Sequence, residues 1–245
     1  MSVDLSIVIP AYNEARRLGP TLDRVAAAMV GRSHEILVVD DGSVDGTVAV
    51  VQAHGAPHLR VIELGRNRGK GAAIRRGVLA STGRRVLLCD ADLSTPIEAL
   101  GVLEAALDAG VQVALGSRSV ATSDVRVRQP WYRVWMGKTF NGLIRLAGVH
   151  GFADTQCGFK LLDGEVARDL FARMKIDRFA FDVELVWLAL RLGHRVVEVG
   201  VPWTNSPDSR VHPIFDAASM FKDVLRIRWL HRGLRPSVVV EERPV

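Results

Sequence analysis

Residues 36–46 read Ile-Leu-Val-Val-Asp-Asp-Gly-Ser-Val-Asp-Gly, and residues 86–92 read Val-Leu-Leu-Cys-Asp-Ala-Asp. Each stretch is an apolar run that ends in carboxylates, which is the pattern of a strand buried in a parallel sheet. Open α/β sheets bind their ligands at the carboxyl ends of such strands. We therefore expect the acids of both stretches to meet at one edge of the sheet and to form part of a binding site there.

The second stretch predicts a metal site at Asp90 and Asp92. Their spacing lets two carboxylates meet one hard cation, which keeps open positions for a diphosphate. Two unpaired carboxylates beside a buried strand would repel each other, and a cation removes that repulsion. The first stretch resembles the start of a calcium loop from Asp41 onward, but Gln52 stands where the bidentate glutamate belongs. Calcium is therefore excluded, and a nucleotide-diphosphate enzyme is the favoured interpretation.

Strand and helix patterns alternate over the first half of the chain, which indicates βαβ units and a mostly parallel sheet. Pro20 and Pro96 suit the first turn of a helix, and Thr95 suits an N-cap. The expected strands are 5–10, 35–40, 59–64, 85–90 and 111–116, and the expected helices are 20–30, 46–53, 71–80 and 96–108.

The alternation breaks after Arg118, and the second half reads as a helical elaboration of the same domain. We expect a basic, aromatic helix at 131–147, a loop or strand at 151–160, a helix at 181–192, a strand at 195–201 and a helix at 214–230. The chain is thus predicted to form a single α/β domain over residues 1–230, followed by a tail at 231–245.

Composition sets broad limits without choosing a partner. The net charge of +5 suits nucleic acid, anionic lipid or phosphate-rich substrates equally well. No apolar run approaches the ~18 residues of a membrane-spanning helix, and no basic-then-apolar leader opens the chain, so a cytosolic location is expected. With Cys89 and Cys157 as the only cysteines, neither a disulfide framework nor a zinc site is expected.

The glycine-rich basic segment at 66–76 does not match a Walker loop. Its glycines are one residue too close, and Gly71 rather than Ser or Thr follows Lys70. A flexible turn that carries Lys70 towards a diphosphate remains open beside a solvated basic face. A dinucleotide-binding dehydrogenase is disfavoured, because no Gly-x-Gly-x-x-Gly follows the first strand. A nucleic-acid binder is also disfavoured, because the aromatic residues cluster away from this segment.

Seven motifs occupy residues 7–14, 38–47, 67–71, 90–92, 116–118, 154–160 and 181–184. Together and in this order, they resemble the signature of family 2 glycosyltransferases. The last three look most like the branch of dolichyl-phosphate (polyprenyl-phosphate) beta-glucosyltransferases.

This resemblance implies a GT-A fold, with residues 1–118 as the nucleotide-sugar half and 119–230 as the acceptor half. It implies a UDP-glucose donor, Mg²⁺ or Mn²⁺, inversion at the anomeric carbon, and a polyprenyl-phosphate acceptor at the inner membrane face. Carried over by position, Asp90 and Asp92 hold the metal, while Arg118 and Asp154 are catalytic. The residues expected to bind the donor are Pro10, Ala11, Tyr12, Glu14, Asp41, Lys70, Asp90, Ala91 and Asp92.

The role of Asp154 depends on the acceptor. A lipid phosphate is already an anion near pH 7 and needs no strong base, so Asp154 would then orient the acceptor. An alcohol would need Asp154 as a general base. Arg118 and Lys70 add positive charge where negative charge develops. Two alternatives stay open: transfer to a soluble hydroxyl acceptor, and a nucleotide-binding module without catalysis.

A phosphate on a lipid requires cations and an apolar approach. Arg133, Lys138 and Arg210 lie outside the nucleotide-binding half and are the candidate acceptor-binding cations. The expected helix at 214–230 is basic and amphipathic, which suits a membrane surface as well as packing on the sheet. Its apolar residues recur at helical spacing beside Lys222, Arg226, Arg228 and Arg232: Ile214, Ala218, Phe221, Leu225 and Trp229.

Overall fold

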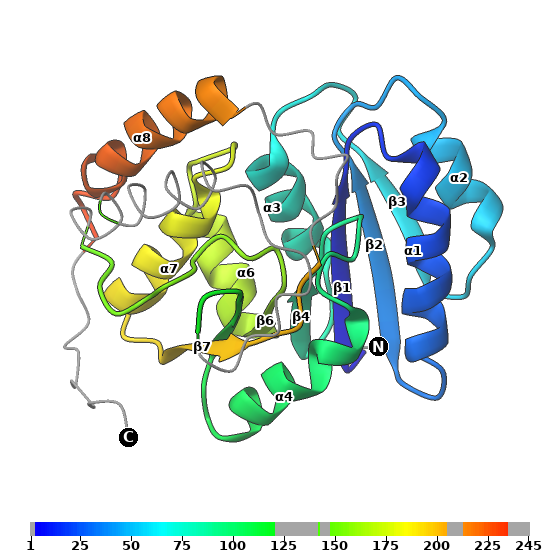
Figure 1. Ribbon diagram of the computed structural model, residues 1–245, viewed down its shortest axis with the longest axis horizontal. Helices are drawn as coiled ribbons and strands as arrows, with labels where there is room; N and C mark the ends of the chain where they lie inside the picture. The colour runs from blue at the N-terminus through cyan, green and yellow to red at the C-terminus, as the bar shows by residue number, and fades with distance from the viewer. Residues whose placement is uncertain (1–2, 121–141, 143–147, 205–212, 235–245) are drawn as a thin grey trace.

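A computed structural model describes residues 3–120, 142, 148–204 and 213–234, and Figure 1 shows their arrangement. One seven-stranded sheet runs through it in the order β3-β2-β1-β4-β6-β5-β7. The sheet consists of β1 (Leu5–Ala11), β2 (His34–Asp40), β3 (Leu59–Glu63), β4 (Arg85–Leu88), β5 (Val113–Ser117), β6 (Lys160–Asp163) and β7 (Val196–Gly200). Six of these strands have both boundaries within two residues of the expected place. The exception is β6, because the segment expected as a loop or strand at 151–160 becomes a strand only at Lys160.

The sheet is mostly parallel, as predicted. Strand β1 pairs in parallel with β2 and β4, β2 with β3, and β5 with β7. Strand β6 is the exception, because it runs antiparallel between β4 and β5. Its first residue, Lys160, lies opposite Leu88 at the carboxyl end of β4. The reversal therefore brings the start of β6 to the edge where the parallel strands end.

Helices cover both faces of the sheet and bury a separate apolar core on each. One face carries α3 (Lys70–Ala80), α6 (Gly164–Arg173), α7 (Phe181–Arg191) and α8 (Pro213–Leu230). These helices contact one another in that order, so α8 is outermost in Figure 1. The other face carries α1 (Ala15–Ala28), α2 (Thr47–His54), the 3₁₀ turn η1 (Ile97–Ala99) and α4 (Leu100–Asp108).

Two expected helix starts are wrong, for the same physical reason. Helix α1 begins at Ala15, so Pro20 lies inside it. Side chains distant in sequence satisfy its first amides: the Glu14 N–H donates to Thr47 Oγ1, and the Ala15 N–H donates to Asp45 Oδ2. Thr95 does not cap η1; Pro96 precedes that turn, and Thr95 Oγ1 lies 3.8 Å from Cys157 Sγ. Tertiary partners decide both starts.

Helix α6 was not expected from the sequence. Its N-cap is Asp163, the last residue of β6, whose Oδ1 accepts from the N–H groups of Glu165 and Val166. A capping aspartate of this kind is a usable sequence signal, but the short strand before it hides the helix start. The predicted helix at 131–147 lies outside the described residues, apart from residue 142.

Within the described residues, none of the helices combines the length and apolar character needed to span a membrane.

Candidate active site

Loops that follow strands β1, β2, β4, β5 and β7 meet at the carboxyl edge of the sheet and carry the expected site residues. Two of these loops hold a non-glycine residue in the left-handed backbone region: Asn13, with φ 56°, and Leu93, with φ 45°. Such residues are uncommon and cluster at functional sites. Leu93 directly follows the Asp90–Asp92 pair, so the backbone of that loop is constrained where the predicted metal ligands stand.

The side chain of Asp41 holds a loop of the protein itself. Its two oxygens accept from the backbone N–H groups of Arg68 and Gly69, at 2.7 and 2.9 Å. Burial raises the pKa of Asp41 above its usual value. The neighbouring Asp40 offers an open acceptor instead: its Oδ2 accepts from Gly42 and Ser43, and its buried Oδ1 has no partner among the described residues. A buried carboxylate oxygen without a protein partner is usually satisfied by an ordered water, an ion or a ligand donor.

Gly42 lets the loops after β2 and β3 approach each other closely. Its φ is +75°, and a Cβ there would lie 2.4 Å from the backbone carbon of Arg66. In the loop after β1, Pro10 and Ala11 belong to the strand, while Tyr12 is exposed. Glu14 is held by an ion pair to Arg17 at 2.6 Å. The three loops thus form one side of the edge, where Tyr12 is exposed and the buried Asp40 Oδ1 has no partner among the described residues.

Asp90 is neutralised by a lysine. Lys70 Nζ, at the start of α3, lies 2.6 Å from Asp90 Oδ1. Beside them, Lys160 Nζ is fully buried and donates to Asp182 Oδ1 and to the Cys157 carbonyl, each at 2.5 Å. Burial opposes the charge on Asp90, but Lys70 outweighs it and holds the pKa of Asp90 below its usual value. Burial likewise opposes the charge on Lys70, yet Asp90 and Asp182 raise its pKa.

Asp92 is the carboxylate of this pair that remains open to a ligand. Its Oδ1 accepts from the Ser94 N–H at 3.0 Å, and its Oδ2 lies 3.9 Å from Arg17 Nη1. The described residues hold no group of three or more His, Cys, Asp or Glu side chains arranged for a metal. Magnesium sites that also bind a phosphate commonly use one or two carboxylates. Asp92 fits a divalent ion shared with a diphosphate, whereas Asp90 already has a cation in Lys70.

Arg118 and Asp154 form a closed pair across the edge. Arg118 Nε and Nη2 donate to Asp154 Oδ2 and Oδ1 at 2.6 and 2.8 Å, and its backbone N–H adds a third bond. The Gln156 N–H donates to Asp154 Oδ1 as well. Burial opposes ionisation of Asp154, but these bonds outweigh it and place its pKa below the usual value. Burial also opposes the charge on Arg118, while Asp154 raises its pKa.

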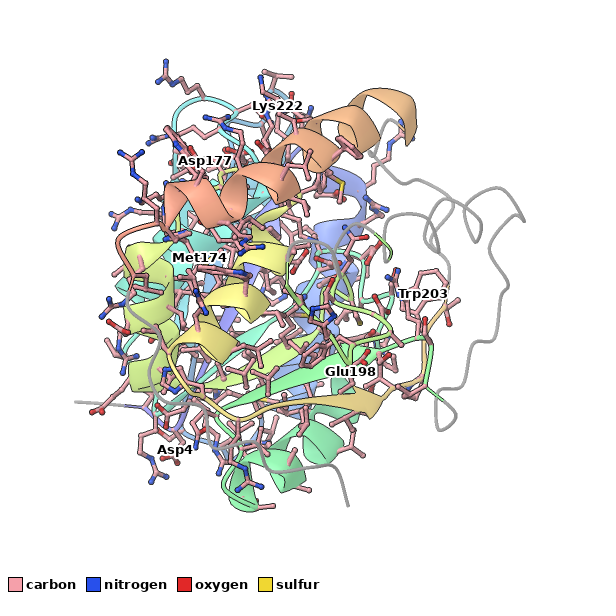
Figure 2. The ribbon with its side chains drawn as sticks, turned by 90° about the vertical axis from the view of Figure 1, so that its left-hand side faces the viewer. Asp4, Met174, Asp177, Glu198, Trp203 and Lys222 are labelled. Carbon is pink, nitrogen blue, oxygen red and sulfur yellow. The ribbon has the colours of Figure 1, made fainter. Side chains whose placement is uncertain are left out.

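Two residues at this edge were not anticipated from the sequence. Glu198 on β7 accepts from the N–H groups of Ala153 and Asp154 at 2.6 and 2.7 Å, so it holds the loop that carries Asp154. The ring of Trp203, which follows β7, lies 5.4 Å from the Arg118 guanidinium carbon. Figure 2 shows both side chains on the same side of the molecule. The sequence signal that could have identified Glu198 is an acid within the apolar run of β7. No comparable sequence signal pointed to Trp203.

Four predicted site residues remain. One of them is buried, and the other three lie outside the residues that the structure describes. Ala91 is buried, and its carbonyl accepts from Thr21 Oγ1 at 2.7 Å, which ties the loop to α1. Arg133, Lys138 and Arg210, the predicted acceptor-binding cations, lie outside the described residues.

We expect Gly158→Ala to lower kcat/KM by about 10²-fold, because a Cβ there would lie 2.0 Å from Asp90 Oδ2 and force that carboxylate to move. Steady-state kinetics and a melting curve test this. Gly101→Ala in α4 is the matched control, since its added methyl meets nothing within 4 Å. Equal activity of Gly158→Ala and Gly101→Ala would show that the fit of Asp90 against Gly158 does not matter for turnover.

A mostly parallel sheet that carries acids, two lysines and an arginine at its carboxyl edge defines an α/β protein with a binding site at that edge. Comparison with known sequences narrows this class. The chain belongs to glycosyl transferase family 2, whose sequence model matches residues 6–171. The family resemblance read from the motifs is therefore confirmed.

Individual relatives agree with this assignment, and solved structures share the fold. The chain is 39% identical to dolichyl-phosphate beta-glucosyltransferase of Drosophila melanogaster, over 92% of this chain and 74% of the relative. It is 36% identical to the enzyme of that name from Homo sapiens, over 91% and 74%. Its fold is similar to glucosyl-3-phosphoglycerate synthase from Mycobacterium tuberculosis in complex with Mn²⁺, UDP-glucose and glycerol 3-phosphate. That TM-score is 0.70 at 21% identity, over 96% of this chain and 82% of that structure.

A second structure, mannosyl-3-phosphoglycerate synthase from Rubrobacter xylanophilus, matches with a TM-score of 0.68 at 26% identity, over 99% of this chain and 78% of that structure. The predicted GT-A fold is confirmed by these matches.

Proposed function

We propose that the protein transfers glucose from UDP-glucose to a polyprenyl phosphate, with inversion at the anomeric carbon. The relatives named dolichyl-phosphate beta-glucosyltransferase support the sugar and the class of acceptor. In the reaction, an oxygen of the acceptor phosphate forms a bond to the sugar C1. The bond from C1 to the UDP oxygen breaks, and UDP leaves with its electron pair.

The hydrogen bonds of Asp154 favour a phosphate acceptor over an alcohol. Both oxygens of this buried carboxylate accept hydrogen bonds from Arg118, and one of them also accepts from Gln156. To remove a proton from an alcohol, Asp154 would have to give up part of its pairing with Arg118. Breaking a buried pair in this way is strongly unfavourable. A phosphate monoester acceptor needs no such step, because it is already an anion near pH 7.

The other charged groups of the edge support the same chemistry. Arg118 uses Nε and Nη2 for Asp154, and its Nη1 has no hydrogen-bond partner among the described residues, so it is available to an anion. Lys70 lies next to the Asp90–Asp92 loop and adds fixed positive charge where the diphosphate leaves. Asp92 would hold Mg²⁺ or Mn²⁺, which when bound supplies Lewis-acid stabilisation of the leaving phosphate.

A screen of donors and acceptors tests this function. We expect glucose transfer from UDP-glucose to a short polyprenyl phosphate, identified by mass spectrometry, and tighter binding of UDP than of GDP in calorimetry with Mg²⁺. Free hydroxyl compounds, including a phosphorylated one such as glycerol 3-phosphate, serve as competing acceptors. Efficient glucosylation of a hydroxyl group, with polyprenyl phosphates ignored, would contradict the proposal and return Asp154 to the role of general base.

We also propose that the protein works at the cytosolic face of a membrane, which it contacts through the outer face of α8. Phe221, Leu225 and Trp229 follow one another at four-residue spacing and are 45%, 53% and 59% exposed. On the opposite side, Val224 and Ile227 are fully buried. Lys222, Arg226, Arg228 and Arg232 are exposed around the apolar stripe, an arrangement that suits an anionic lipid surface.

Binding to liposomes tests the membrane contact. Each cation near an anionic surface contributes about 1 kcal/mol, so binding to anionic vesicles should fall as salt rises. Arg226→Glu with Arg228→Glu should weaken co-sedimentation. Arg24→Glu on α1 with Arg32→Glu in the turn after it makes the same change in net charge. Helix α1 lies at the opposite side of the molecule from α8 in Figure 1, so this pair should have a smaller effect. Equal weakening by both pairs would mean that net charge, and not α8, controls binding.

A further inference from the structure

A small pocket opens at the carboxyl edge between the loop after β4 and the segment after β7. It is lined by Asp90, Ser94, Thr95, Gly158, Phe159 and Trp203, and it has room for about one water-sized group. Its walls are held in place by tertiary contacts. The Thr204 N–H donates to the Ser94 carbonyl at 2.9 Å, and Thr95 Oγ1 lies 3.8 Å from Cys157 Sγ.

The chemistry of the lining matches that of a sugar ring. A pyranose presents apolar C–H groups on its faces and hydroxyl groups around its rim. Trp203 is 8% exposed, and the part of its ring that lines the pocket offers an apolar surface to the C–H groups of a sugar. Ser94 and Asp90 offer a hydroxyl and a carboxylate, which suit a sugar hydroxyl. A single hydroxyl is also close in size to the group that the pocket can hold.

The pocket lies between the groups assigned to the two substrates. Asp90 belongs both to the pocket and to the loop that carries Asp92, where a diphosphate would bind. On the other side, Trp203 contacts Arg118, whose guanidinium carbon is 5.4 Å from the ring centroid. A sugar that links the diphosphate to the incoming acceptor has to occupy the space between Asp92 and Arg118.

We infer that this pocket, called here the Trp203 pocket, binds one hydroxyl of the donor hexose, with Trp203 against the ring. This rests on the proposed function, and it adds the subsite that selects the sugar. Trp203 and Ser94 determine specificity for the sugar, whereas the nucleoside is bound elsewhere, by the loops near Tyr12 and Asp40. Replacing Trp203 should therefore weaken recognition of the hexose and leave recognition of UDP unchanged.

Saturation-transfer difference NMR with UDP-glucose and Mg²⁺ tests this inference without turnover. In the parent protein, both the uracil and the glucose-ring protons should receive saturation. In Trp203→Ala the ring signals should fall relative to the uracil signals, while the Kd for UDP stays within about twofold. The KM for UDP-glucose should rise roughly threefold to tenfold, as expected for a lost aromatic contact. Val102→Ala, which shortens an exposed apolar side chain on α4, is the control and should change none of these values.

Two further variants separate recognition from folding. Trp203→Phe keeps an aromatic ring and should retain part of the ring signal even if Trp203→Ala melts early. Ser94→Ala should lower the ratio of kcat/KM for UDP-glucose to kcat/KM for UDP-galactose. In the parent protein, the wrong epimer would leave the Ser94 hydroxyl without a hydrogen-bond partner, and the variant removes this penalty.

The outcomes distinguish this inference from the proposed function. If Trp203→Ala shows uracil saturation and unchanged glucose-ring signals, the Trp203 pocket does not bind the hexose, and the proposed UDP site is unaffected. Absence of any saturation of UDP-glucose in the parent protein would overturn both.

Discussion

Asp92→Ala is expected to lower kcat by about 10³-fold while the protein stays folded. A bound metal contributes several kcal/mol to stabilising the leaving phosphate, and each 1.36 kcal/mol corresponds to a factor of ten. The fold should survive because Asp92 makes one backbone hydrogen bond, to Ser94, and only a 3.9 Å contact with Arg17. Steady-state kinetics, calorimetric Mn²⁺ binding in the presence of UDP, and melting curves measure the three effects.

Asp90→Asn is the informative contrast to Asp92→Ala. It leaves the partly buried Lys70 without its partner at 2.6 Å. Removing one partner of a fully buried ion pair costs about 3–5 kcal/mol of stability, and the 23% and 34% exposure of the Lys70 and Asp90 side chains reduces this cost. We therefore expect a clear fall in the melting temperature for Asp90→Asn and a small one for Asp92→Ala. Asp169→Ala, an exposed acid on α6, controls for loss of charge. Full activity of Asp92→Ala, or of the parent in excess EDTA, would remove the metal from the mechanism.

Removing Asp154 should cost no further activity once Arg118 is gone. If Asp154 acts only by holding Arg118, the double variant Arg118→Ala with Asp154→Ala should be about as slow as Arg118→Ala alone. Each single variant is expected to lose about 10²–10³-fold in kcat, the usual effect of removing a group that stabilises developing charge. A double-mutant cycle measures this coupling directly. Losses that multiply would show that Asp154 has its own role, as a general base would.

The pH dependence gives a second readout of the same pair. Because the folded pKa of Asp154 is lowered, the pair stabilises the fold above the unfolded pKa of about 3.9. That stability disappears as the pH falls through the lower, folded value. Asp154 therefore stays ionised at neutral pH. If kcat/KM falls at the acid end of the range from pH 5 to 9, we expect the same fall in Asp154→Asn. A fall that is present in the parent protein and absent from Asp154→Asn would indicate that Asp154 acts as a base and titrates in this range.

The sequence alone predicted the scaffold and its active edge. Apolar runs of strand length, ended by acids or glycines, located β1 to β5 within two residues, because burial on both faces of a parallel sheet leaves a local pattern. The order of the motifs predicted the family correctly. The sequence patterns did not predict α6 or the start of α1. The start of α1 depends on Thr47 and Asp45, which accept from its first N–H groups and come from elsewhere in the chain.

The tertiary structure decided which of the predicted groups are free to act. Asp154 and Arg118 are 36 residues apart, and only the antiparallel course of β6 beside β5 brings them into a bidentate pair. Lys70 neutralises Asp90 and leaves Asp92 as the open carboxylate. Trp203 becomes part of the site because β7 ends beside β5. Sequence patterns record burial and local spacing, whereas ion-pair partners are chosen by sheet order and register, which are properties of the whole fold.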